Sequence, residues 1–342
     1  MTRARVVRAL LFLGIAAGLF VNVGNDRAWR QSEERCAKVV AEMVRSGDWL
    51  VPRLDGAPRL QKPPLFYWAG AVAAELGGTN LWTLRGVSGL AALALAAAVW
   101  RAGRELGDER TGDVCTFALA GSALFFVRGR VGDAEMLLAL CVFAALAAFE
   151  RLWRTRDRKL LAPLAVLVGL AFLAKATAAL LCIFAPIAVW LALERRLRLA
   201  LRPAVLGWAA VAAAIGLSWY VAIVLFVPEA AEALRAFLVA PLGKQAGSDA
   251  THLRGFLYYW PRFPVEVLPA GVLLPWVAYE GWRSRFWGDD AGLRFWAVAF
   301  LAQLFSWSVV PSKQIHYLLP TVPVYALLAG RTVDARIARG RG

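Results

Sequence analysis

Long apolar runs separated by short polar segments set the pattern of this chain. A membrane-spanning helix needs about 20 mostly apolar residues, and about ten runs approach that length. They lie at residues 6–23, 87–99, 116–127, 136–152, 160–174, 177–193, 205–227, 265–279, 295–310 and 315–330. The pattern predicts an all-α polytopic membrane protein with about ten transmembrane helices.

The basic residues predict how the chain is oriented in the membrane. The chain has 39 Lys and Arg against 24 Asp and Glu, is 60% hydrophobic and holds 15 Trp, which is not the composition of a soluble domain. Its Arg clusters fall between apolar runs, as the positive-inside rule expects, and do not form a nucleic-acid-binding patch. If residues 65–76 form an interfacial or re-entrant helix, every dense Arg cluster and both termini lie on the cytoplasmic side. The outer segments are then residues 24–85, 128–135, a turn at Lys175, 228–264 and 311–314.

The first outer segment, residues 24–85, holds the most unusual chemistry. Between residues 32 and 45 apolar side chains recur every three to four positions, which predicts a short amphipathic helix. Ser32 can cap that helix, Arg35 lies in its first turn and Gly47 follows its end. The prolines that follow predict an ordered loop. A long polar loop among hydrophobic helices is usually functional, so this segment is the first candidate for a site.

Two groups of acids face outward in this topology. Glu33 and Glu34 lie at the start of the predicted loop helix, and Asp133 and Glu135 lie just before the run at 136–152. Carboxylates that converge from separate loops suit general-base chemistry or a divalent metal. The alternative is that acids at helix starts only favour the helix dipole. The sequence leaves both interpretations open.

Lysine is rare, with only six among the 39 basic residues. Four of these lie in outer segments or at their edges: Lys62, Lys175, Lys244 and Lys313. Ammonium groups bind phosphate as point charges, so these positions predict a phosphate at the membrane surface, with lipid headgroup contact as the alternative. The outer His and Tyr side chains are, one by one, more typical of interfacial anchors: His252, Tyr258, Tyr259, His316 and Tyr317.

Several familiar signals are absent from the sequence. It has no Gly-rich phosphate loop, no dinucleotide fingerprint and no run of acids for a nucleotide-sugar metal, so a soluble nucleotide donor is not expected. The four cysteines predict neither a disulfide framework nor a zinc site. Charges are rare within the spans, which argues against a transporter, although Lys175 between two short runs could mark a broken helix of that kind.

Four stretches of sequence, taken in order, resemble one family. They are SGDWLVP followed by KPPLFYW, then GLAFLAKATAALL, HLRGFLYYWP and PSKQIHYLLPTVPVYALLAG. This order resembles the C-type glycosyltransferases that use polyprenyl-phosphate sugars, above all the bacterial aminoarabinose transferases of lipid A and the protein O-mannosyltransferases. The resemblance covers residues 29–330.

The resemblance implies an inverting transfer. An acid on the first outer segment accepts the proton of an acceptor hydroxyl as its oxygen attacks the anomeric carbon, and the lipid phosphate leaves beside basic residues. By position, Glu135 is the second acid, which positions the acceptor or the base. Glu33 is the candidate for the base, one position after the residue that matches the usual base of the family. The residues implied in substrate binding are Lys62, Lys244, Lys313, Tyr317, Arg35, Asp133, His252 and Tyr259. Two Glu could hold a divalent ion, but the resemblance requires none.

One departure from the family pattern concerns the base. The first motif of the family normally begins Asp-Glu, with the Asp as the presumed base, and the matching pair here is Ser32-Glu33. The expected base is therefore replaced by Ser32, and Glu33, or as an alternative Glu34, would have to take its place by a small shift of the loop. Three functions therefore stay open: a transferase, a non-catalytic protein that binds lipid-linked sugars, and a lipid flippase or transporter.

The expected organisation and partners follow from the same resemblance. The chain stops where lipid A-modifying relatives continue, so residues 1–342 are expected to form a single transmembrane glycosyltransferase-like domain with no C-terminal soluble domain. The expected partners are a polyprenyl-phosphate-linked sugar donor, a lipid, glycan or protein acceptor, and membrane lipids. The expected location is the bacterial inner membrane, with the active site facing outward.

Overall fold

A computed structural model of the chain describes residues 3–21, 23–24, 30–239, 253–284 and 290–339. Within these ranges the only sheet is an antiparallel hairpin of β1 (Arg53–Leu54) and β2 (Ala57–Pro58). The α-helices are α1 (Arg3–Phe20), α2 (Gln31–Ser46), α3 (Leu65–Gly77), α4 (Leu81–Leu106), α5 (Glu109–Ala120), α6 (Ala123–Gly129), α7 (Ala134–Thr155), α8 (Leu161–Ala179), α9 (Ala185–Leu193), α10 (Pro203–Phe226), α11 (Pro228–Val239), α13 (Tyr259–Glu266), α14 (Leu274–Arg283), α15 (Ala291–Val309) and α16 (Val322–Arg339). Short 3₁₀ or π segments are η1 (Arg158–Leu160), η2 (Leu180–Phe184), η3 (Leu197–Leu201), η5 (Phe256–Tyr258), η6 (Ala270–Leu273) and η7 (Ile315–Thr321). The predicted all-α class is confirmed.

Five helical stretches in the described part of the chain are long and apolar enough to cross a membrane. They are Leu81–Leu106, Ala134–Thr155, Arg158–Leu193, Pro203–Phe226 and Ala291–Val309. At about 1.5 Å per residue, a helix such as α7 extends over about 33 Å, close to the thickness of the hydrocarbon layer. The protein is a polytopic helical membrane protein.

The stretch from η1 to α9 turns back on itself at Lys175, as the pattern of two short runs predicted. Lys175 has non-helical backbone angles (φ −167°, ψ 91°) inside α8. Trp190, late in α9, packs against Trp153, near the end of α7, with ring centroids 5.8 Å apart. Since η1 begins just after α7 ends, α8 leaves that end and α9 returns to it. The turn therefore holds Lys175 at the opposite end.

Two of the predicted spans are not continuous helices. The run at 116–127 divides into α5 and α6, and the run at 265–279 divides among the end of α13, η6 and α14. Backbone hydrogen bonds join the two breaks: the N–H of Ala123 donates to the carbonyl of Leu268 at 2.9 Å, and that of Ala270 donates to the carbonyl of Gly121 at 2.7 Å. Each break leaves backbone groups without a partner inside its own helix, and these two hydrogen bonds let the breaks supply partners to each other.

The first outer segment folds largely as the sequence predicts. Helix α2 covers the predicted amphipathic helix, and Gly47 ends it in the left-handed conformation (φ 71°). The predicted cap is wrong: the N-cap position is Arg30, without a side-chain bond, and the Ser32 hydroxyl donates to Asp133 instead. Helix α3 corresponds to the predicted interfacial helix at 65–76, and it packs on α2 through a cluster that includes Val40, Phe66 and Tyr67.

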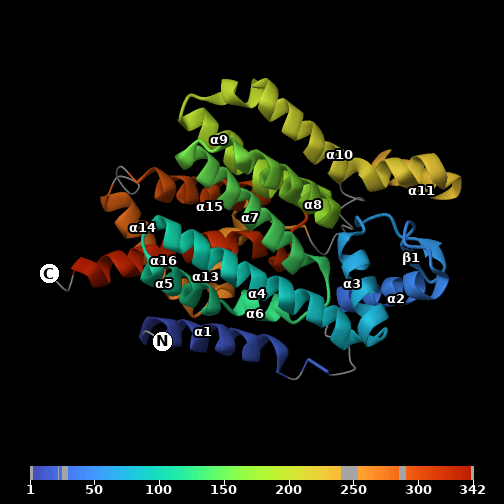
Figure 1. The fold of residues 1–342 in the computed structure, drawn as a ribbon, viewed down its shortest axis with the longest axis horizontal. Coiled ribbons are helices and arrows are strands. Elements are labelled where there is room, and N and C mark those ends of the chain that lie inside the picture. The colour runs from blue at the N-terminus through green and yellow to red at the C-terminus, as the bar shows by residue number, and fades with distance from the viewer. Residues whose placement is uncertain (1–2, 22, 25–29, 240–252, 285–289, 340–342) are drawn as a thin grey trace.

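Close packing in the centre depends on small residues. Figure 1 shows α4, α5, α7 and α16 at the centre, with α1 along one side and α2, α3 and β1 gathered at one end. A Cβ on Gly330 of α16 would lie 2.4 Å from the Cα of Cys115 on α5. No other residue fits there, which is typical of closely packed helices in membranes. All four cysteines are buried and free.

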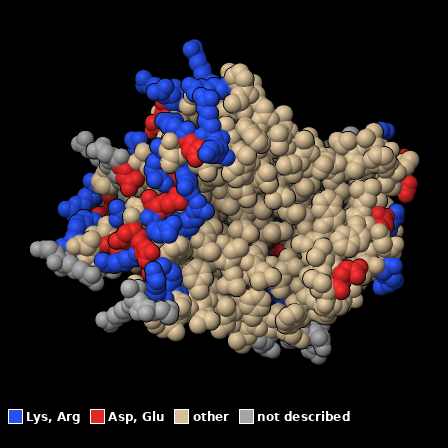
Figure 2. Space-filling view, viewed as in Figure 1, with Lys and Arg blue, Asp and Glu red and all other residues tan. Residues whose placement is uncertain are grey.

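Charged side chains are segregated along the long axis of the molecule. Figure 2 shows Lys and Arg, with Asp and Glu among them, gathered over the end that carries both chain termini in Figure 1, while the middle of this face is almost entirely uncharged. At the charged end Arg8 pairs with Asp113 at 2.7 Å, and Arg151 pairs with Glu105 at 3.2 Å. Asp133 and Glu135 lie at the other end of α7.

Candidate active site

Polar side chains from several segments meet at the N-terminal end of α7. Asp133 is the N-cap of this helix, and its Oδ1 accepts the backbone N–H of Glu135 at 3.1 Å. Acids are favoured at this position because the first turn of a helix carries unpaired N–H groups and the positive end of the dipole. Asp133 and Glu135 are both buried, with at most 2% exposure. The helix start thus fixes two acids in the interior.

Glu33 lies in a buried ion pair. Its Oε1 accepts a hydrogen bond from Nε of Arg85 at 2.8 Å, and its Oε2 accepts one from Nη2 of the same residue at 3.0 Å. Both side chains are 0% exposed. The backbone N–H of Gly132 also donates to Oε1, at 2.8 Å. Both oxygens of Glu33 are therefore engaged, and the pair joins α2 to α4 and to the segment before α7.

Asp133 is engaged in the same way. Its Oδ2 accepts a hydrogen bond from Nη2 of Arg128, with which it forms a buried ion pair. The same oxygen accepts a second hydrogen bond from the hydroxyl of Ser32 at 3.1 Å. Ser32 stands where the family pattern has an acid, and here it donates a hydrogen bond to another acid. With Oδ1 capping α7, each oxygen of Asp133 already has a partner.

Glu135 differs from these two acids. Its Oε1 accepts a hydrogen bond from Nζ of Lys175 at 2.8 Å and lies 3.4 Å from Nε2 of His316. Its Oε2 accepts no hydrogen bond from any residue that the structure describes. Of the buried acids predicted from the sequence, Glu135 is the one that combines a basic neighbour with an oxygen left for a substrate.

Lys175 and an aromatic pair form the next layer. The ammonium lies 4.3 Å from the centroid of the Tyr317 ring, and that ring stacks on Trp307 with centroids 4.8 Å apart. Burial raises the pKa of Tyr317 to about 12, so its phenol stays protonated and can donate a hydrogen bond. The break in α8 places the Lys175 ammonium between Glu135 and Tyr317.

Lys62 lies close to the same acids without pairing with them. It is half-buried and makes no hydrogen bond or ion pair with the described residues. Burial lowers the pKa of Lys62, but its interactions with Cys36 and with the carboxylates of Glu135 and Asp133 raise it, and the net change is upward. Nearby, Arg59 Nε and the Tyr67 hydroxyl are buried and have no hydrogen-bond partner in the described part. This side of the site presents donors that an anion could satisfy.

The other predicted site residues are less central. Lys313 is buried, donates to the carbonyl of Val310 and lies 6.0 Å from the ring centroid of Tyr259. The Tyr259 hydroxyl donates to the carbonyl of Gln314 at 3.0 Å, and Arg35 is half-buried on α2. Lys244 and His252 lie outside the described residues.

Sequence reasoning missed the basic partners of the acids. Arg85 and Arg128 hold Glu33 and Asp133, and Arg59 lies beside Tyr67 near Lys62. Arg85 and Arg128 do carry one signal, since both lie outside the dense Arg clusters that the predicted topology assigns to the cytoplasm.

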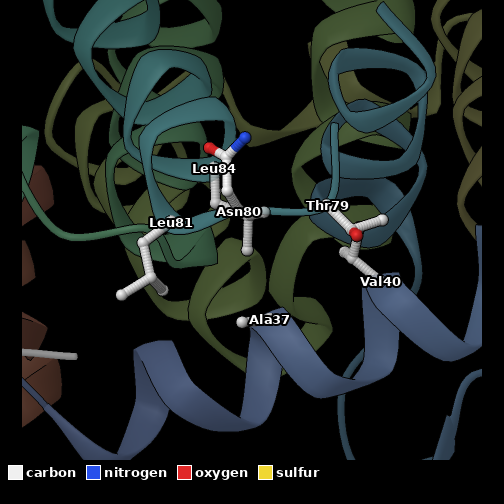
Figure 3. Close-up of a pocket in the computed structure, with 6 residues that line it drawn as sticks. All are labelled: Ala37, Val40, Thr79, Asn80, Leu81 and Leu84. Atoms are coloured by element: carbon white, nitrogen blue, oxygen red, sulfur yellow. The ribbon is translucent and has the colours of Figure 1, made fainter. Parts of the chain in front are cut away.

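Two other features do not add to the site. No group of three or more His, Cys, Asp or Glu among residues 3–339, with the gaps named above, is arranged to hold a metal ion. A cavity of about 220 Å³ lies between α2 and the turn from α3 to α4, lined by Ala37, Val40, Thr79, Asn80, Leu81 and Leu84 (Figure 3). Its one amide, Asn80, is engaged as the N-cap of α4, so the cavity offers no acid or base.

The sequence matches a known family over the part of the chain that holds most of this site. The family model described as dolichyl-phosphate-mannose-protein mannosyltransferase matches residues 61–234, about half of the chain. The chain belongs to this family. The matched range includes Lys62, Arg85, Asp133, Glu135 and Lys175. The family resemblance inferred from the sequence is confirmed.

Individual proteins that are similar to this chain are glycosyltransferases by name. The chain is 29% identical over 340 residues to undecaprenyl phosphate-alpha-4-amino-4-deoxy-L-arabinose arabinosyl transferase 1 of Sodalis glossinidius, covering 93% of this chain and 58% of the relative. It is 30% identical over 317 residues to the corresponding transferase of Edwardsiella ictaluri, covering 88% of this chain and 55% of the relative. The chain thus spans less than two thirds of the length of these relatives.

Solved structures share the fold. ArnT from Cupriavidus metallidurans bound to undecaprenyl phosphate matches with a TM-score of 0.83 at 22% identity, over 95% of this chain and 60% of that one. The oligosaccharyltransferase of Archaeoglobus fulgidus matches with a TM-score of 0.57 at 16% identity, over 99% of this chain and 51% of that one. The helical architecture of this family member is therefore that of ArnT.

Proposed function

We propose that this protein transfers a sugar from a polyprenyl-phosphate carrier to an acceptor hydroxyl at the outer face of the bacterial inner membrane. The observation that carries the proposal is the meeting of Glu135, with one free oxygen, and the basic residues Lys62 and Lys175 at one end of α7. The family match and the relatives named for undecaprenyl-phosphate sugars support this donor class.

The basic side of the site suits the leaving group. As the acceptor oxygen attacks the anomeric carbon, the bond from that carbon to the phosphate oxygen breaks and negative charge develops on the lipid phosphate. Lys62, Arg59 and the Tyr317 phenol would donate to that phosphate, and Lys313 would add charge from the adjacent segment. Donors held in place before the reaction stabilise such charge without reorganisation. Attack opposite the departing phosphate inverts the anomeric centre.

The acids divide into two roles in this proposal. Glu33 and Asp133 are engaged on both oxygens, so they would hold α2, α4 and the start of α7 together. Glu135 would be the acid beside the acceptor. Glu33 as the base, in place of the acid that Ser32 replaces, stays a prediction that a Glu33→Gln variant tests.

The topology belongs to the same proposal. We propose about ten spans, both termini in the cytoplasm and the site at the outer face. The charged end in Figure 2 supports this orientation, because it lies at the far end of α7 from Glu135. A domain of this kind would receive its donor laterally from the outer leaflet. Residues 1–342 would act as a single transmembrane domain.

A second function has one specific observation in its favour. Ser32 occupies the position of the usual acid and is hydrogen-bonded to Asp133. A protein that binds lipid-linked sugars without transferring them would tolerate this replacement.

Reconstitution distinguishes these functions. The purified protein in liposomes is given radiolabelled polyprenyl-phosphate sugars and total membrane acceptors, and label leaving the lipid is followed. Wild type should transfer label. Lys62→Ala should transfer it at least about tenfold more slowly, because it lacks a charged hydrogen bond to the phosphate. Lys38→Ala is the matched control, since Lys38 is an exposed lysine on α2 with only loose ion pairs at 3.6 and 3.9 Å.

Other outcomes would reject the transferase. Donor binding without release of label in wild type would support the binding protein. Movement of labelled lipid between leaflets, without transfer, would support a flippase.

A further inference from the structure

His316 stands against the acid at the centre of the site. It lies on η7, and its Nε2 is 3.4 Å from Oε1 of Glu135, the oxygen that also accepts the Lys175 ammonium. The side chain is 21% exposed, so the ring is mostly enclosed but can be reached. Its second nitrogen, Nδ1, makes no hydrogen bond with any residue that the structure describes. One nitrogen thus faces a carboxylate, and the other has no hydrogen-bond partner among the described residues.

This arrangement matches the way enzymes prepare an imidazole base. A carboxylate that faces one ring nitrogen fixes the tautomer that carries its proton there and stabilises the imidazolium that forms. With the proton on Nε2 beside Glu135, the lone pair is on Nδ1. In structures without substrate such contacts are often long and shorten in the reacting complex.

The surrounding charges keep the ring neutral before reaction. Four charged groups face His316: Glu135 from α7, Lys175 from the α8 turn, Arg128 from α6 and Lys62 from the first outer segment. Burial lowers the pKa of His316 well below its usual value, Glu135 opposes this change, and the three basic groups add to it. A neutral imidazole is the form that can accept a proton. The phosphate of a bound donor would offset the basic groups and so favour the protonated ring as the reaction proceeds.

Two of the other acids at the site, Glu33 and Asp133, are already occupied. Both oxygens of Glu33 are bound by Arg85, and Oδ2 of Asp133 is held by Arg128 and Ser32. Ser32 itself has no basic group. The position that supplies the acid in the family pattern therefore offers no proton acceptor here.

We propose that His316 is the general base of the transfer and that Glu135 positions it. This inference rests on the proposed function. The acceptor hydroxyl forms the new bond from its oxygen to the anomeric carbon and gives its proton to Nδ1 of His316. The bond from that carbon to the phosphate oxygen breaks, and its electron pair leaves with the polyprenyl phosphate. The imidazolium, paired with the Glu135 carboxylate, then releases its proton to water.

The test measures transfer by the full chain in liposomes with a radiolabelled polyprenyl-phosphate sugar. His316→Asn keeps a polar side chain of similar width but cannot act as a base. Its kcat should fall by about 100-fold or more, the usual contribution of a general base, while the KM for the donor changes little. The wild-type kcat should also decline toward acid pH through one protonation, and the residual rate of the variant should lack that step.

A second variant separates catalysis from structure. His316→Ala leaves space for a small base, so added imidazole should restore part of the rate at pH 8 and much less at pH 5, where imidazole is protonated. A kcat of His316→Asn within threefold of wild type, loss of donor binding in that variant, or absence of rescue in His316→Ala would each overturn the assignment. Absence of transfer by wild type itself would instead remove the proposed function, and this inference with it.

Discussion

Removing the negative charge of Glu33 tests whether this acid holds the structure together or performs chemistry. Its carboxylate makes two bonds to the Arg85 guanidinium, at 2.8 and 3.0 Å, and accepts the N–H of Gly132 at 2.8 Å, all without exposure to solvent. Removing one partner of a buried ion pair costs about 3–5 kcal/mol, because the other charge stays buried without compensation. In a chain of this size about 1 kcal/mol corresponds to a few degrees in melting temperature. We therefore expect Glu33→Gln to lower the melting temperature by about 5–10 °C.

The assay is thermal unfolding in detergent, followed by tryptophan fluorescence and by the loss of the monodisperse peak in size-exclusion chromatography. A double variant, Glu33→Gln with Arg85→Met, removes both charges and should recover part of the loss. Glu34→Gln is the matched control, because Glu34 is the neighbouring acid on α2, is exposed and pairs only with Lys38 at 3.6 Å. If Glu33→Gln melts like wild type while transfer stops, the structural role is refuted and Glu33 is the base.

Three further predictions follow from the site. Lys175→Met should lower both stability and turnover, because it leaves the buried Glu135 carboxylate without its ammonium at 2.8 Å, while Lys159→Met at the exposed, charged end of the molecule should change neither. Equal melting temperatures for the two variants would contradict the pairing. Ser32→Ala should cost about 1 kcal/mol of stability through the lost bond to Asp133, and transfer should stay within threefold of wild type; abolished transfer would give Ser32 a direct part in the reaction. The pKa of His316 is lowered in the folded protein, so the unfolded chain binds more protons below about pH 6.5. Stability should therefore fall as the pH drops below that value and stay level above it, and His316→Asn should reduce this dependence, as melting temperatures between pH 5 and 8 would reveal.

The sequence predicts the helices correctly where one apolar run forms one helix. Helices α7 and α15 lie where the runs at 136–152 and 295–310 predicted them, and the amphipathic pattern after residue 31 located α2. Lys175, an isolated charge between two apolar runs, correctly marked the turn. In each case the segment's own sequence is enough for the prediction. The spacing of its apolar residues reflects whether the helix is buried in lipid or packed against one neighbour.

The failures have a common physical origin in contacts between distant segments. The break between α5 and α6 is stabilised by backbone bonds to Leu268 and Ala270, which hydropathy cannot reveal. The partner of Glu33 is Arg85, 52 positions away, and the partner of Ser32 is Asp133, 101 positions away. Family motifs ranked Glu33 as the base from its place in the sequence, whereas the packing of α2 against α4 decides which oxygens stay free.

The most direct test of the account is the single-turnover rate of Glu135→Gln. The variant keeps the shape of the side chain and removes the charge that pairs with Lys175 and faces His316. With donor already bound in liposomes, we predict that transfer slows by about 100-fold or more while donor affinity changes little. A single-turnover rate equal to that of wild type would contradict the central claim that Glu135 takes part in the transfer.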